Sequence, residues 1–187
     1  VLRGVVKNTI SFYMRILRAI YNKAVKDNLT KQNYPFRNVY TGIDKTRKRA
    51  LDEKGVKKIM GLDLKDSPTL TLSRDLFIFS YCMRGMSFVD IAFLRRQNFD
   101  GNYITYHRQK TGQRLSVLVE PCIARIIERY AKKSEGSPYI FPIISSENPE
   151  EAYRQYQTAL GYHNRKLKEL AKRANVNLPL SSYWARH

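Results

Sequence analysis

The sequence predicts a mainly α-helical protein that carries one small antiparallel β-sheet, an α+β fold. Apolar residues recur at three- and four-residue steps through most of the chain, which is the period of an amphipathic helix. Residues 103–107 and 114–119 instead are rich in aromatic and β-branched side chains, and Lys110-Thr111-Gly112 lies between them. Together these patterns predict several helices and one β-hairpin.

The sequence of the N-terminal part predicts a helix followed by a linker. Residues 9–28 have a helical apolar period, and we expect them to be the last helix of a small domain within residues 1–36. Residues 37–50 have little periodicity and contain the basic run 45–49, so they are interpreted as a basic linker. Residues 51–187 then form the second domain.

Helix-start signals order the first half of this second domain. Asp52 is a candidate cap for a helix that ends near Met60. Ser67-Pro68 combines a candidate cap with a proline that suits the first helical position. The strongly apolar helix that follows is expected to end near Cys82.

The second half continues with shorter elements. Ser87 is a candidate cap for a short helix, Phe88–Arg95, and the β-hairpin comes next. A helix is expected from Pro121 to about residue 133, and a long one, capped at Asn148, to about residue 174. A final helical segment starts at Ser181 or Ser182.

Composition narrows the class of partner. The 187 residues include 34 Lys and Arg against 16 Asp and Glu, a net charge of +18. Residues 1–60 carry 15 of these basic residues against 4 acidic ones, a net of +11. An excess of this size favours a polyanion, and nucleic acid is the default partner. The candidate phosphate-contacting residues are Arg15, Arg18, Lys45, Arg47, Lys48 and Arg49.

Other function classes fit the sequence poorly. A hydrophobic fraction of 43% is too high for a disordered chain, and the apolar runs are too short to cross a bilayer. Two cysteines make no disulfide framework, so we expect a reducing cytoplasm. Three scattered histidines and two cysteines show no zinc-ligand spacing, so no metal or cofactor is expected.

Three places combine charge with a special position, and the residues alone leave each of them open. Arg84 follows the apolar helix and could clamp an oxyanion, or it could cap that helix and pair with Asp90. Lys110 at the hairpin tip could act in a site or be solvated. Arg186 and His187 could face a phosphate or form a surface end.

In this order, the three places resemble the catalytic domain of the tyrosine recombinase (phage integrase) family. The first motif is Cys82-Met83-Arg84-Gly85-Met86-Ser87-Phe88-Val89-Asp90-Ile91-Ala92-Phe93-Leu94. Lys110 matches the family's hairpin lysine, and Tyr183-Trp184-Ala185-Arg186-His187 matches its second motif, commonly His-x-x-Arg-His. The resemblance spans nearly the whole chain and implies the integrase catalytic fold, with residues 1–36 as part of a SAM-like core-binding domain.

The sequence departs from the family pattern at several points. Asp90 follows Arg84 by six residues rather than three, and Tyr183 stands where histidine is usual. A phenol is a weak base near neutral pH, so the usual proton-transfer role there is in doubt. None of the 13 tyrosines lies after Arg186, so we expect a catalytic domain truncated before the family's nucleophile.

The resemblance implies a reaction that cleaves and rejoins DNA through a 3′-phosphotyrosyl intermediate without a metal. Arg84 and Arg186 would bind the non-bridging oxygens of the transition state, and Lys110 would protonate the leaving 5′-oxygen. Asp90 would orient Arg84 or support the fold, and His187 would contact the phosphate or brace Arg186.

The resemblance also implies partners and a location. Duplex DNA is the expected substrate, the full-length protein is expected to act as a homotetramer on DNA, and this fragment is expected to be monomeric and inactive alone. The expected setting is a mobile genetic element in the bacterial cytoplasm, at the nucleoid. Three alternatives stay open: a type IB topoisomerase, a non-catalytic DNA-binding protein with a degenerate recombinase domain, and an RNA- or ribosome-binding domain.

Overall fold

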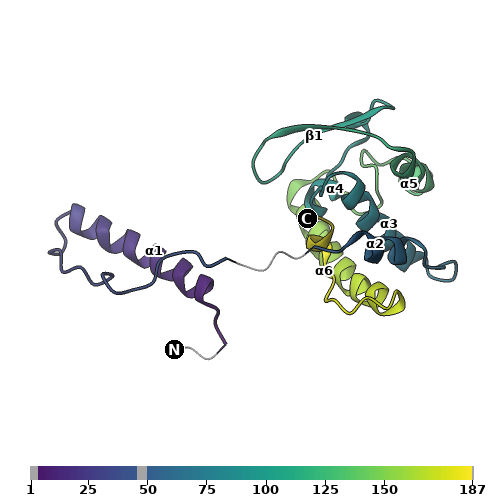
Figure 1. Ribbon diagram of the computed structural model, residues 1–187. Coiled ribbons are helices and arrows are strands. Elements are labelled where there is room, and N and C mark those ends of the chain that lie inside the picture. The colour runs from purple at the N-terminus through teal and green to yellow at the C-terminus, as the bar shows by residue number, and fades with distance from the viewer. Residues whose placement is uncertain (1–3, 46–49, 187) are drawn as a thin grey trace. The chain divides into compact units, whose positions relative to one another are not determined.

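The chain divides into two compact units, Val1–Arg47 and Lys48–His187 (Figure 1). The structure is a computed structural model that describes residues 4–45 and 50–186, with the main chain alone for Arg186. It is mainly helical and contains a two-stranded antiparallel sheet, which confirms the predicted fold class.

The first unit is built on helix α1, Lys7–Lys26. The segment that follows returns along this helix. Asn8 and Asp44 exchange two hydrogen bonds of 2.8 and 3.0 Å, and the buried Ser11 hydroxyl donates to the Gly42 carbonyl. Part of the segment interpreted as a linker is therefore held against α1.

The second unit is arranged around α3, Pro68–Cys82. This helix contacts α2 (Glu53–Met60), α4 (Phe88–Ala92), α5 (Pro121–Ala131), α6 (Pro149–Arg173) and the 3₁₀ helix η2 (Ser182–Arg186). Eight of its 15 residues are buried, among them Leu70, Phe77 and Phe79. A helix that is apolar on several sides must be covered on several sides, so α3 forms the centre of the core.

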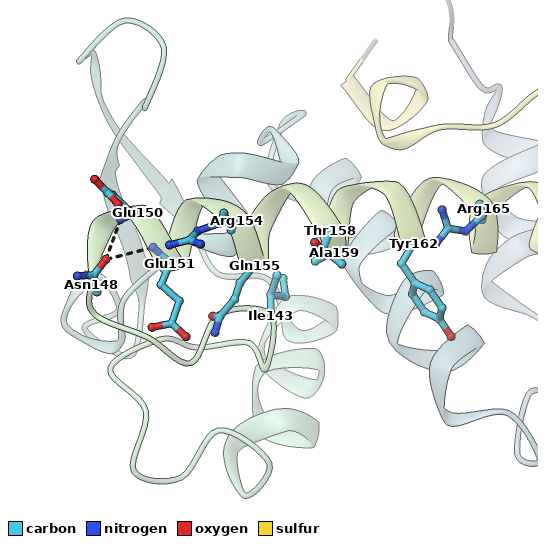
Figure 2. A pocket seen from close by; sticks show the side chains of 10 residues that line it. All are labelled: Ile143, Asn148, Glu150, Glu151, Arg154, Gln155, Thr158, Ala159, Tyr162 and Arg165. Atoms are coloured by element: carbon cyan, nitrogen blue, oxygen red, sulfur yellow. Dashed lines mark hydrogen bonds between the residues drawn. The ribbon is translucent and has the colours of Figure 1, made fainter.

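Three predicted helix caps are confirmed. The Asp52 side chain accepts from the Gly55 amide at 2.9 Å, and Ser87 accepts from the Asp90 amide. Asn148 accepts from the amides of Glu150 and Glu151 at the start of α6 (Figure 2). Ser67 precedes Pro68 as expected, but its side chain makes no cap hydrogen bond.

The β-hairpin lies at the predicted position. Strand β1, Tyr103–His107, pairs with β2, Arg114–Leu118, so that His107 lies opposite Arg114. Ile104, Tyr106 and Val117 alternate with exposed or half-buried residues and join the core. The second strand ends one residue before the predicted Val119.

Two predicted helices are shorter in the structure. Helix α4 ends at Ala92 rather than Arg95, because Ile140 donates to the Leu94 carbonyl at 2.9 Å and Arg95 forms a β-bridge with Tyr139. A short 3₁₀ helix, η1 (Arg96–Asn98), follows. Helix α5 ends at Ala131 rather than residue 133.

Candidate functional site

Arg84 lies in the tight turn that ends α3. Its amide donates to the Tyr81 carbonyl at 3.2 Å, and the Gly85 amide donates to the Ser80 carbonyl at 2.9 Å. This pair of bonds is the Schellman motif, in which the first residue past the cap has left-handed backbone angles. Arg84 is that residue, with φ of 54°.

Arginine is an unusual choice for this position, which normally takes glycine or asparagine. Helices α1 and α6 end in the same motif, and there the left-handed residues are Asn28 (φ 58°) and Asn175 (φ 51°). A left-handed residue with a Cβ costs about 1–2 kcal/mol. The exposed Arg84 is thus held in a strained conformation, which is a pointer to function.

Asp90 joins the Arg84 region to the Lys110 turn. The buried carboxylate accepts from the Ser87 hydroxyl at 2.6 Å and from the Gln109 amide at 2.8 Å. Among the described residues no ion pair joins Arg84 to Asp90, so the structure does not support the alternative in which Arg84 pairs with Asp90. The carboxylate supports the hairpin turn instead.

Lys110 is exposed on the turn between β1 and β2. The Arg108 amide donates to the Gln113 carbonyl at 2.9 Å, and Gly112 closes the turn with φ of 67° and a bond to the Arg108 carbonyl. Because Asp90 binds the residue just before Lys110, the turn is fixed to α4 at that point.

The second motif lies on η2, which packs against α3 and α6. The Ser182 amide donates to Asn164 on α6 at 2.9 Å, and Leu180 and Ala185 are buried in the core. Tyr183 is 44% exposed on the same element. The main chain of Arg186 belongs to η2, whereas its side chain and His187 lie outside the described structure.

The structure thus connects the elements that carry Arg84, Lys110 and Tyr183. Helix α3 ends at the Arg84 turn and contacts η2, and Asp90 ties the Lys110 turn to α4. The catalytic assignments of these residues themselves stay predictions.

The candidate DNA-binding residues lie in and after the first unit. Arg15, Arg18 and Lys45 are exposed, and Arg18 donates to the Thr41 hydroxyl at 3.0 Å. Arg18 therefore helps to hold the returning segment against α1. Arg47, Lys48 and Arg49 lie outside the described residues.

Sequence reasoning missed an ion network around the buried Asp75 carboxylate, between α3 and α5. The Asp75 carboxylate accepts from Arg129 at 2.6 Å, from the Tyr130 hydroxyl at 2.8 Å and from Arg74 at 3.0 Å. This contact raises the pKa of Arg129, and burial together with Asp75 raises the pKa of Tyr130. An acidic residue inside the strongly apolar helix was the available signal, because a buried charge requires partners.

His163 is a second buried polar residue that the sequence did not single out. Its ring stacks on Phe88 with centroids 4.6 Å apart, and its Nδ1 has no hydrogen-bond partner within the described chain. Burial lowers the pKa of His163 to about 4. The histidine falls within the apolar period of α6, which is more typical of the core than of a site.

Other features of the described residues lie apart from these motifs. A groove of about 810 Å³ runs along α6 past Arg154, Tyr162 and Arg165 (Figure 2), and none of the candidate catalytic residues lines it. No group of three His, Cys, Asp or Glu side chains in the described parts could hold a metal ion. No described helix is long and apolar enough to span a membrane.

Comparison with solved structures finds the fold of lambda integrase. The lambda integrase (75–356) dimer bound to a COC′ core site matches with a TM-score of 0.62 and 15% identity, over 91% of this chain and 58% of that chain. A longer lambda integrase dimer on the same site matches with a TM-score of 0.61 and 15% identity, over 90% of this chain and 47% of that chain. The lambda integrase tetramer bound to a Holliday junction matches with a TM-score of 0.53 and 15% identity, over 91% of this chain and 52% of that chain.

The chain therefore spans about half the length of these solved structures. At this identity the likeness concerns the fold. No family model matches the sequence. No curated protein matches it either.

Proposed function

We propose that this chain is part of a site-specific DNA recombinase of the tyrosine recombinase type. One observation carries the proposal. In a chain with the lambda integrase fold, the buried Asp90 carboxylate ties the Lys110 turn to α4, the helix that follows Arg84. The net charge of +18 suits a DNA duplex as substrate.

The proposed reaction begins when a tyrosine oxygen attacks the phosphorus of a DNA phosphodiester. The tyrosine hydroxyl loses its proton, a phosphotyrosyl bond forms at the 3′-phosphate, the bond to the 5′-oxygen breaks, and the 5′-oxygen takes up a proton. Arg84 and Arg186 bind the non-bridging oxygens, where negative charge gathers in the transition state. Lys110 gives the proton to the leaving oxygen. Attack by another 5′-hydroxyl reverses the step and joins new strands.

The remaining motif residues have supporting roles in this proposal. Asp90 positions the Lys110 turn, and His187 contacts the phosphate or braces Arg186. Tyr183 occupies the position of the family's histidine and hydrogen-bonds the phosphate region without serving as the base. The nucleophile is a tyrosine further along the natural polypeptide than Arg186.

The proposal extends to assembly and setting. Lambda integrase forms dimers on a core site and a tetramer on a Holliday junction. By analogy the complete protein would act as a homotetramer on two duplexes of a bacterial mobile element, in the cytoplasm. The fragment alone would be monomeric and would bind DNA without cleaving it.

Covalent trapping tests the proposed reaction. Nicked duplexes would be mixed with this chain and with the longer product of its natural reading frame, and adducts would be separated on denaturing gels. We expect an adduct with the longer protein alone, and its loss in Arg84→Ala and Lys110→Ala variants that still bind duplex. Lys168→Ala, an exposed lysine on α6, is the matched control and should cleave normally.

The outcomes separate the competing functions. Normal cleavage by Arg84→Ala would reject the active-site assignment. Tight duplex binding without an adduct from either protein would favour a DNA-binding protein with a degenerate recombinase domain. Equal affinity for duplex DNA and single-stranded RNA would favour the RNA-binding alternative.

A further inference from the structure

The two cysteines of the chain meet in the folded second unit. Cys82 is the last residue of α3 and Cys122 is the second residue of α5, and their sulfur atoms lie 3.5 Å apart. They are 40 residues apart in sequence, so the packing of α3 against α5 creates the pair. A disulfide has an S–S distance of about 2.05 Å, so a combined movement of about 1.5 Å would bond them.

Both cysteines are partly buried, and one of them borders a surface pocket. Cys122 is partly buried and lines a surface pocket of about 240 Å³ together with Arg74, Arg125 and Arg129. This pocket is large enough to admit a small oxidant. Three guanidiniums against the single Asp75 carboxylate leave it positively charged, which suits a thiolate that attacks an oxidant.

Cys82 has the character of a second, resolving thiol. Burial, and next the hydrogen bond with Cys122, raises the pKa of Cys82 to about 12. It is therefore protonated near neutral pH, so Cys122 is the thiol that reacts first with an oxidant. It also lies two residues before the strained Arg84, within the last turn of α3.

We propose that Cys82 and Cys122 are a redox-active pair that forms an intramolecular disulfide when the protein meets a peroxide. The Cys122 thiolate attacks one peroxide oxygen, the O–O bond breaks, and Cys122 becomes a sulfenic acid as hydroxide leaves and is protonated to water. The Cys82 sulfur then attacks the sulfenic sulfur, and the hydroxyl group leaves as a second water with the Cys82 proton. Two thiols and one hydrogen peroxide thus give one disulfide and two waters, with two electrons passing to the peroxide.

The disulfide also has a consequence for the Arg84 turn, and this part rests on the proposed function. Closing the sulfur gap draws the last turn of α3 toward α5 and shifts the turn that presents Arg84. A displacement near 1 Å can slow an enzymatic step by about 10²-fold. We expect the oxidised protein to form the phosphotyrosyl adduct at least tenfold more slowly, and a thiol reductant to restore the rate.

Thiol counting on the full chain tests the pair without DNA. The chain would be treated with hydrogen peroxide, denatured and alkylated with N-ethylmaleimide, and analysed by intact mass and peptide mapping. We expect two alkylated cysteines before oxidation and none after it, a linked Cys82–Cys122 peptide, no covalent dimer, and full recovery with dithiothreitol. Cys82→Ser and Cys122→Ser are the matched controls, and neither should form a reversible intramolecular link.

Stability gives a second readout on the same samples. A cross-link that closes a loop of this length should raise the midpoint of thermal unfolding by about 10 °C, reversibly with dithiothreitol. Methionine oxidation is not reversed by dithiothreitol and would affect the serine variants equally. Two thiols that remain alkylatable after peroxide, or products that are sulfinic acids or dimers, would overturn the proposal.

The two proposals fail separately. A disulfide that forms while no adduct is ever trapped would leave the redox pair standing and reject the recombinase function. A trapped adduct whose rate is unchanged by a verified disulfide would reject the control of Arg84 by the pair.

Discussion

Arg84 occupies a backbone conformation that glycine would adopt with less strain. We expect Arg84→Gly to stabilise the second unit by about 1 kcal/mol, since the penalty for a left-handed residue with a Cβ is relieved. The same variant should lose covalent adduct formation in the longer protein. Urea unfolding measures the first effect and trapping on nicked duplex the second.

Asn175 provides the matched control for this prediction. It has the same position in the motif that ends α6, and asparagine tolerates left-handed angles better than arginine does. Asn175→Gly should therefore change stability by less than about 0.5 kcal/mol and leave activity intact. A destabilised Arg84→Gly variant would show that the arginine side chain supports the fold rather than a reaction.

Because His163 is buried, we expect the free energy of unfolding to fall in mild acid. Its folded-state pKa of about 4 lies below the ordinary value of 6.5. Above pH 6.5 neither the folded nor the unfolded state carries the proton, so no penalty exists. Between pH 6.5 and 4 the unfolded state binds a proton that the folded state excludes, and stability falls by about 3 kcal/mol.

Carboxylates also titrate in this range, so the measurement compares two proteins. His163→Leu removes the titrating ring and the unpartnered Nδ1 from the same buried place. Urea unfolding at pH 7, 5.5 and 4 should show that the variant gains stability relative to the parent as the pH falls. A constant difference between the two proteins would contradict the assignment.

At the scale of elements, Asp90 couples the hairpin turn to α4. Asp90→Ala removes the acceptor for the Gln109 amide, so the turn that carries Lys110 loses its anchor. We expect faster hydrogen exchange across residues 109–112 and at least tenfold slower adduct formation, with duplex affinity retained. Exchange mass spectrometry and trapping measure the two effects.

Asp100 is the control carboxylate at the other end of the same hairpin. It accepts from the amides of Asn102 and Tyr103 at 2.9 and 2.7 Å, and these contacts lower the pKa of Asp100. Asp100→Ala should loosen that end and leave exchange at the Lys110 turn unchanged. Equal effects of both variants on the turn would indicate a general loosening of the sheet.

The Asp75 network holds α3 against α5. Asp75→Ala would leave the Arg74, Arg129 and Tyr130 donors without their shared acceptor, and we expect a loss of about 3–5 kcal/mol. Tyr130→Phe removes one of these bonds and should cost about 1 kcal/mol. Urea unfolding checks both values. Asp63→Ala, which breaks a largely exposed pair with Lys65, should change stability by less than about 0.5 kcal/mol.

At the scale of the whole molecule, we expect the basic run at residues 45–49 to contribute to the proposed affinity for DNA. Replacing its four cations with glutamine should weaken duplex binding and reduce the salt dependence, by about 0.9 in the log–log slope for each phosphate that the run neutralises. Titrations of labelled duplex at several salt concentrations measure this slope. Replacing Arg47 and Arg49 with lysine keeps the charge and should preserve it; an unchanged slope after full neutralisation would mean that the run does not touch DNA.

Local signals predicted the elements well because they act over a few residues. Asp52, Ser87 and Asn148 cap helices as expected, and the hairpin lies at the expected position. The predicted end of α4 was wrong because a distant segment, Tyr139 and Ile140, forms backbone hydrogen bonds with the residues that were expected to continue the helix. The catalytic assignments stay predictions, since they depend on a resemblance and not on local chemistry.

The sequence by itself determined the helical class, the basic charge and the order of the motifs, because composition and periodicity are properties of the chain as written. Tertiary structure decided which distant groups meet. Asp90 binds the Lys110 turn and not Arg84, and Cys82 meets Cys122, because α3 packs against α4 and α5. Contacts across 19 and 40 residues depend on how several helices bury a common core, which no local pattern encodes.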